Sequence, residues 1–241
     1  MKKLRLIMAL TIAAAMLALS CTKENNVSKK EDASQEESEF IPSEGDIVMN
    51  FSAEVEKDDE SSKTAIDEDG NVSWVENDEV RIYWTASDYA VASAASSGVS
   101  TVFNDVSVGS SEYYYAVYPA VESGINPASQ KVTVTVPASQ NGAFADVNYM
   151  VARTLSGGSS LKFYYMCSVV KFNILRSDIS EVTLRSADGS AIAGSVTADY
   201  SAVSSFADTP VFTTTDGADE ISIAISGPGT YYAAILPGKA I

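Results

Sequence analysis

Short apolar runs that alternate with polar residues constrain this chain more than any other feature. Alternation with a period of two places successive side chains on opposite faces of an extended backbone, so such runs predict β-strands. They are rich in Val, Ile, Tyr, Phe and Thr, and Gly, Asn, Asp and Pro separate them. No segment carries a sustained stripe with the 3.6-residue period of a helix. The runs are residues 47–55, 71–75, 79–84, 113–118, 131–136, 161–175, 182–185, 221–225 and 231–236.

Many short strands joined by turns are typical of an all-β protein built as a sandwich or a barrel. An outer-membrane barrel competes with a sandwich because its strands also alternate. A barrel, however, needs strands of about ten residues with aromatic girdles. Most runs here have five to seven residues. We therefore predict β-sandwiches.

The length of the chain allows one large β-domain or two small ones. The best candidate boundary is the small-residue stretch Ser-Gly-Gly-Ser-Ser at 156–160. We expect a first sandwich at 46–155 and a second at 160–241. A further strand is expected after the run at 231–236, so the second sandwich is expected to be incomplete.

The N-terminal residues have the pattern of a secretory signal. Lys2, Lys3 and Arg5 precede an uncharged stretch at 6–19. As a helix this stretch would reach roughly 21 Å, short of the bilayer core of about 30 Å. A basic start, a short apolar run and small residues at its end indicate a cleaved signal at 1–20 rather than a membrane span. A buried N-terminal helix is the alternative.

The sequence Ala18-Leu19-Ser20-Cys21 resembles the lipobox of bacterial lipoproteins, whose cysteine is diacylated and becomes the new N-terminus. Ala18 stands where Leu is usual, and ordinary cleavage after a small residue is the alternative. Cys167 is the only other cysteine, so the chain has no disulfide framework. Because two or three acyl chains anchor stably where one holds weakly, a lipid on Cys21 would suffice to attach the protein to a membrane.

Residues 21–45 form a polar, acidic stretch that cannot bury enough apolar surface to offset the entropy of ordering it. We expect a tether that lifts a folded body off the membrane. Removal of residues 1–20 changes the net charge from −16 to −19, because three basic and no acidic residues leave. So acidic a protein is a poor nucleic-acid binder. Thr22-Lys23-Glu24 loosely resembles the surface-export signals of Bacteroidetes lipoproteins, which points to the outer membrane and the cell surface.

The chain contains no histidine, which removes the usual catalytic triads, His-ligated metals and the common general base. Cys167 lies within an apolar run, where a free cysteine is usually a small buried hydrophobe. We therefore expect neither an enzyme nor a cofactor.

Two acidic segments invite other interpretations. The segment 67–71, Asp-Glu-Asp-Gly-Asn, suggests calcium, but its glycine comes fourth where an EF-hand loop needs it sixth. Gly and Asn between two strands favour a hairpin turn. Glu76, Asp78 and Glu79 suggest a glycosidase, yet such enzymes pair two separately placed acids. A solvated turn is the preferred interpretation.

Tyr113, Tyr114, Tyr115 and Tyr118 suggest a sugar-binding face. In a strand, Tyr113 and Tyr115 share one side while Tyr114 faces the other, so at least one side is expected to be core. A glycan-binding surface lipoprotein of a polysaccharide uptake system is therefore kept as the alternative function.

A succession of degenerate motifs runs across residues 46–237, namely Lys63-Thr64, Gly70-Asn71-Val72-Ser73-Trp74, Asn77-Asp78-Glu79-Val80-Arg81-Ile82-Tyr83, Tyr114-Tyr115-Ala116-Val117-Tyr118-Pro119, Val136-Pro137-Ala138-Ser139-Gln140, Leu161-Lys162-Phe163 and Tyr231-Tyr232-Ala233-Ala234-Ile235-Leu236-Pro237. Taken in order, these motifs resemble the Bacteroidales fimbrillin-like (Mfa-like) lipoproteins. The resemblance implies transthyretin-like β-sandwiches in tandem, a surface location and a structural or adhesive role in fimbriae. Its partners would be other fimbrial subunits or host and bacterial surface ligands.

In fimbrillins of this kind a protease removes the lipidated segment, and the vacated groove accepts a strand from the next subunit. Backbone hydrogen bonds then supply affinity, and alternate side chains that fill pockets supply specificity. An ordinary permanent strand is the alternative here. The alternating face of the first strand would be Ile47, Met49, Phe51, Ala53 and Val55.

One difference between this sequence and such fimbrillins bears on this mechanism. Arginine-directed maturation needs an arginine between Cys21 and the early strands, but the first arginine after Arg5 is Arg81. The departure favours an anchor, an accessory subunit or a non-polymerising surface lipoprotein in which the lipid on Cys21 is retained.

Overall fold

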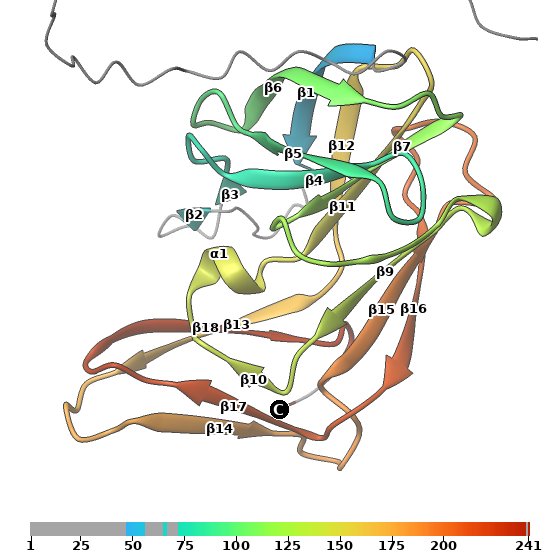
Figure 1. The fold of residues 1–241 in the computed structure, drawn as a ribbon. Helices are drawn as coiled ribbons and strands as arrows, with labels where there is room; N and C mark the ends of the chain where they lie inside the picture. The colour runs from blue at the N-terminus through green and yellow to red at the C-terminus, as the bar shows by residue number, and fades with distance from the viewer. Residues whose placement is uncertain (1–46, 56–64, 67–71, 240) are drawn as a thin grey trace, which may run out of the picture. The chain divides into compact units, whose positions relative to one another are not determined.

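The computed structural model describes residues 47–55, 65–66, 72–239 and 241 (Figure 1). Eighteen strands and two short helical segments lie within these residues, so the prediction of an all-β sandwich protein is confirmed. The signal peptide, Cys21 and the tether predicted for residues 1–45 lie outside the described residues. None of the described helices is long and apolar enough to cross a membrane.

The strands are short and closely spaced along the chain, as the alternating runs predict. In chain order the elements are β1 (Ile47–Val55), β2 (Ala65–Ile66), β3 (Val72–Ser73), β4 (Glu79–Tyr83), β5 (Tyr89–Ser93), β6 (Ser100–Val108), β7 (Tyr113–Tyr118), β8 (Gly124–Asn126), η1 (Pro127–Ser129), β9 (Lys131–Val136), β10 (Ser139–Gln140), α1 (Phe144–Val147), β11 (Met150–Leu155), β12 (Ser160–Tyr165), β13 (Ser168–Ile174), β14 (Glu181–Arg185), β15 (Gly194–Asp199), β16 (Val211–Asp216), β17 (Glu220–Ala224) and β18 (Gly229–Ile235).

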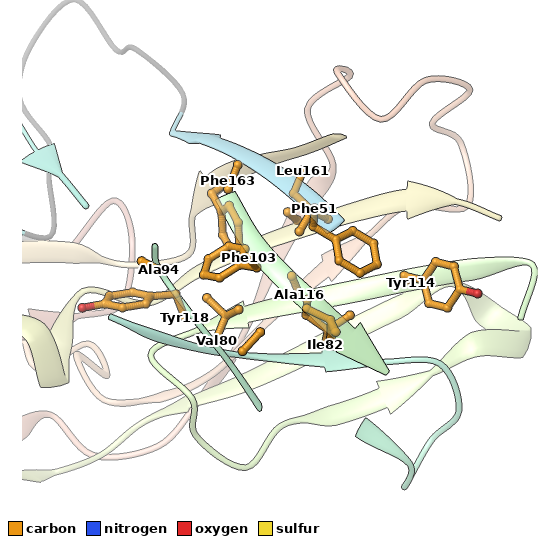
Figure 2. Close-up of a cluster of buried hydrophobic side chains, with 14 of the residues drawn as sticks. Phe51, Val80, Ile82, Ala94, Phe103, Tyr114, Ala116, Tyr118, Leu161 and Phe163 are labelled. Atoms are coloured by element: carbon orange, nitrogen blue, oxygen red, sulfur yellow. The ribbon is translucent and has the colours of Figure 1, made fainter. Parts of the chain in front are cut away.

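The largest sheet has seven strands in the order β5-β4-β7-β11-β12-β1-β6. Its two outer strands approach each other, because the Ala95 amide donates to the Val102 carbonyl oxygen at 3.0 Å. The sheet therefore curls almost into a barrel around a first core. Trp74 lies in this core and makes edge-to-face contacts with Phe103 and Phe163, at ring-centroid distances of 5.6 and 5.1 Å. Figure 2 shows the aromatic and aliphatic side chains that meet there.

A second core forms where the outer face of the seven-stranded sheet packs on a four-stranded sheet of order β16-β15-β9-β8. Alternation along β7 explains how one strand serves both cores. Tyr114 and Ala116 point into the first core, whereas Tyr115 and Val117 point into the second. All four side chains are buried, which is why this run is apolar at every position.

The two-stranded ribbon β13-β18 separates the second core from a third. In β18, Tyr232 and Ala234 belong to the second core, while Tyr231 and Ala233 belong to the third. The three-stranded sheet β10-β17-β14 supplies the other side of the third core.

Residues 156–160, where the sequence predicts a boundary between two sandwiches, form a hairpin turn within one sheet. Strands β11 and β12 on either side are antiparallel neighbours, with Met150 opposite Tyr165. Gly157 adopts a φ of +76°, which fits a tight turn. Small residues mark hairpin turns as well as linkers, and only the pairing distinguishes them. The sequence offers no single boundary between the sheets. The chain leaves the seven-stranded sheet after β7 to form β8, β9 and β10, returns to it with β11 and β12, and leaves it again near Met166 and Cys167.

Candidate functional site: the β1 strand

Strand β1 lies in the seven-stranded sheet with a neighbour on each edge. It runs parallel to β12, with Ala53 opposite Leu161, and antiparallel to β6, with Phe51 opposite Phe103. Both partners are distant in sequence, so non-local contacts hold β1. Among the described pairings of the seven-stranded sheet, β1 with β12 is the one parallel pair, and the others are antiparallel.

Of the five residues on the predicted alternating face of β1, four lie against the first core. Phe51 and Ala53 are fully buried, and the Phe51 ring lies edge-on to Tyr114 with centroids 5.9 Å apart (Figure 2). Met49 and Val55 are partly buried against the same core. Ile47 is 42 % exposed, because the first residues of β1 pair only with β6 and extend past the core.

A bulge fixes the register of β1, and the alternating pattern gives no sign of it. The pairing with β6 shifts between Met49 and Phe51. Opposite the shift, Asp105 adopts a φ of +53°, and its amide donates to the Asn50 side-chain oxygen at 2.7 Å. An extra residue in one strand prevents a slip by one position, which would turn Phe51 away from the core.

Serine residues join β1 to β12 on the outer face of the sheet. The Ser52 amide donates to the Ser159 carbonyl oxygen at 2.7 Å, and the Ser52 and Ser160 hydroxyl oxygens are 3.4 Å apart. A cavity of about 280 Å³ adjoins this contact. It is lined by Ser52, Ala53, Glu54, Ser100, Ser160, Leu161 and Phe206.

The connection from β15 to β16, which carries Phe206, is fixed beside β12 by two side chains. The Tyr164 hydroxyl donates to the Ala207 carbonyl oxygen at 2.5 Å. Arg153, which is buried, donates through Nη1 to the Tyr200 carbonyl oxygen at 3.2 Å and through Nη2 to that of Val203 at 3.0 Å. No sequence pattern singles out Arg153, because arginine side chains normally lie on the protein surface.

Aromatic rings surround the Arg153 guanidinium. Its central carbon lies 4.8 Å from the Tyr113 ring centroid and 5.0 Å from that of Tyr200. Nη1 also donates to the Gln130 side-chain oxygen at 2.6 Å. Burial raises the pKa of Tyr115 to about 12, although the nearby Arg153 charge acts in the opposite direction. The tyrosine therefore stays neutral, and carbonyl and amide oxygens together with ring faces surround the cation.

The tyrosines that suggest a sugar-binding face are mostly core residues. Tyr114, Tyr115 and Tyr118 are buried, and Tyr113 is half-buried against the second core. The Tyr118 hydroxyl donates to Asp78 at 3.3 Å, and burial followed by the Asp78 charge raises the pKa of Tyr118. A glycan would have to contact other residues.

The acidic segments adopt turn geometry where they are described. Asp78 accepts the Val75 amide at 2.7 Å, and Asn77 has a φ of +71°. Residues 67–71 lie outside the described residues, but β2 and β3 on either side pair as an antiparallel hairpin. The described part of the chain contains no group of three or more acidic or cysteine side chains placed to hold a metal ion.

Cys167 packs against the second core, as predicted for a small hydrophobe. Its thiol donates to the Val147 carbonyl oxygen at 3.3 Å. Burial raises the pKa of the thiol to about 12. Since the thiolate is the nucleophile, this raised pKa disfavours reaction of Cys167 at neutral pH.

Comparisons of the chain with protein-family models, with curated proteins and with solved structures found no match. The role of the protein must therefore be inferred from its own residues and from the geometry around β1.

Proposed function

We propose that this protein is a surface-exposed lipoprotein of the fimbrillin type, held at the outer membrane by a lipid on Cys21. It serves as a structural or adhesive component of fimbriae, in the position of an anchor, an accessory subunit or a tip. The signal sequence, the lipobox and the ordered succession of fimbrillin-like motifs support this proposal. The burial of β1 between two distant strands is the structural observation that carries it.

The position of β1 suits a load-bearing attachment. The acidic stretch after Cys21 leads into β1, which pairs with β6 along one edge and β12 along the other. Tension along the chain would load backbone hydrogen bonds on both edges and would have to withdraw Phe51 from the core. A β1 that stays inserted would favour an anchor or accessory role over a shaft subunit. The absence of an arginine between Cys21 and Arg81 supports the same choice.

Immunogold labelling of intact cells tests the location, and a Cys21→Ser variant tests the anchor. We expect surface label on cells that make the natural protein. Fimbriae should detach into the medium when Cys21→Ser replaces it. Absence of surface label, together with fimbriae that stay attached in the variant, would contradict the proposal.

A disulfide that locks β1 in place separates an anchor from a shaft subunit. Ser52 and Ser160 are register partners with adjacent hydroxyls, so Ser52→Cys with Ser160→Cys would join β1 to β12. The matched control is Thr133→Cys with Thr197→Cys, a cross-strand pair in the four-stranded sheet with hydroxyl oxygens 2.8 Å apart. If β1 is permanent, neither lock alters fimbrial attachment. Loss of assembly with the β1 lock alone would show that β1 is exchanged.

A further inference from the structure

Strand β14 presents an unpaired backbone edge. It is the last strand of the sheet β10-β17-β14 and pairs only with β17 among the described strands. Two hydrogen bonds to the β17 side flank it, from the Ile225 amide to the Ser180 carbonyl oxygen at 2.9 Å and from the Ser186 amide to that of Asp219 at 3.0 Å. Because antiparallel ladders alternate, Val182 and Leu184 also bond towards β17. The amides and carbonyls of Glu181, Thr183 and Arg185 therefore point outwards.

The sequence of β14 is complementary to itself when two copies run antiparallel. It reads Glu-Val-Thr-Leu-Arg, with an acid at one end and a base at the other. Pairing about Thr183 places Glu181 of each copy opposite Arg185 of the other. We propose that β14 is a dimerisation edge, at which two copies of this chain join antiparallel with Thr183 opposite Thr183.

This register matches every outward backbone group. Thr183 would face Thr183 of the second copy, and Glu181 would face Arg185, at positions where both residues point outwards. Each such pair exchanges two N–H···O bonds. A shift by one residue would place outward groups opposite inward ones, so the two-fold register is the one that leaves no outward group of β14 unpaired. The result is a continuous sheet of two β10-β17-β14 units.

The side chains reinforce the pairing on both faces. Arg185 already contacts Glu220 of β17, whereas Glu181 has no ion-pair partner among the described residues. In the dimer, Arg185 would lie between Glu220 and Glu181 of the second copy. On the other face, Val182 and Leu184 are partly buried against the third core. In the dimer, Val182 of one copy would lie opposite Leu184 of the other. Opposite charges and apolar pairs at facing positions stabilise a sheet.

Charge distinguishes β14 from another edge of the same region. Among the described strands, β13 pairs only with β18, so its other edge is also unpaired there. Antiparallel self-pairing about the centre of β13, however, would place Lys171 opposite Lys171. Like charges directly opposite are unfavourable, and lysine on an edge is a common protection against strand addition. The free edge of β14 carries the matched charges instead.

Disulfide trapping tests the proposal on the full-length chain purified in mild detergent. Facing residues of an outward pair have Cα atoms about 5.5 Å apart, within disulfide range. Thr183→Cys should therefore form a covalent dimer under mild oxidation. The control Thr214→Cys lies on exposed strand β16 and should form far less. Five-residue strands bury a small area, so the contact is weak, and trapping accumulates what equilibrium methods would miss.

Charge variants in the Thr183→Cys background test the register. Glu181→Arg places two like-charged pairs at the contact and should lower the dimer yield about tenfold. Adding Arg185→Glu and Glu220→Arg rebuilds the row with reversed signs and should restore the yield. Equal cross-linking of Thr183→Cys and Thr214→Cys would overturn the proposal, and so would a yield that Glu181→Arg leaves unchanged. The outcome does not depend on the location or the fimbrial role of the protein.

Discussion

Arg153 Nη2 donates to the carbonyl oxygen of Val203 at 3.0 Å, and this contact joins β11 to the connection between β15 and β16. The guanidinium is buried, and among the described residues no carboxylate forms an ion pair with it. Its charge is balanced by carbonyl and amide oxygens and by two tyrosine rings. This arrangement depends on the arginine side chain, because removing the cation leaves several buried acceptors unsatisfied.

We predict that Arg153→Met lowers the free energy of unfolding by about 2–4 kcal/mol. The substitution preserves much of the apolar stem but removes the donors to Tyr200, Val203 and Gln130. Urea denaturation measures the loss. Limited proteolysis should also show new cleavage between residues 201 and 209, since their attachment to β11 is lost. An unchanged midpoint with no new cleavage would contradict the assigned role.

Phe51→Ala should destabilise the protein by about 3–5 kcal/mol, because it removes a fully buried ring and leaves a cavity beside Tyr114. Ile47→Ala on the same strand is the matched control. Ile47 is 42 % exposed, so its loss should cost less than about 1 kcal/mol. Thermal or urea unfolding of both variants gives the comparison. Equal effects would mean that β1 is not inserted in the register described.

Gly194→Ala should be far more damaging than Gly157→Ala. An added Cβ at Gly194 would lie 2.3 Å from the Thr215 carbonyl oxygen, which belongs to the paired strand and cannot move away. Gly157 also has a positive φ, but nothing lies within 4 Å of its added Cβ. We expect about 1 kcal/mol for Gly157→Ala, from backbone strain alone. For Gly194→Ala we expect loss of the pairing between β15 and β16, visible as accelerated amide exchange in both strands.

The alternating runs predict which residues are extended and which faces are buried. A two-residue repeat of apolar side chains indicates both the extended backbone and the face that packs on the core. Phe51 and Ala53 are buried for that reason. The alternation does not indicate which strands pair with each other. Residues 156–160 have the composition of a linker, and only the pairing of Met150 with Tyr165 identifies them as a hairpin turn.

The alternation of apolar and polar residues also does not predict the roles of polar side chains that interrupt it. Arg153 is a buried cation in an apolar strand, and Asn50 holds a bulge through its side chain. Both roles depend on residues far away in sequence, namely Val203 and Asp105. A local pattern reports the environment of a strand but not the identity of the distant groups that a polar side chain meets.

Stability should fall between about pH 4 and pH 2 because of Asp199. A hydrogen bond from the Ser201 side chain is the main cause that lowers the pKa of Asp199 to about 2; the Ser201 amide, at 2.9 Å, and Lys131, at 3.0 Å, act in the same direction. The unfolded carboxyl titrates near 3.9. A group whose pKa is lower in the folded state contributes stability above the unfolded value, and this contribution disappears as the pH falls through the folded value.

Asp199→Asn should therefore be less stable than the natural protein at pH 5, and the difference should shrink as the pH falls to about 2. Lys131→Met is the informative control, because it removes the ion pair but leaves both Ser201 hydrogen bonds in place. That variant should keep most of the pH dependence. Urea denaturation at pH 5, 4, 3 and 2 for the three proteins measures both effects. If Lys131→Met abolishes the pH dependence as fully as Asp199→Asn, then the ion pair, and not Ser201, holds the carboxylate in its charged form.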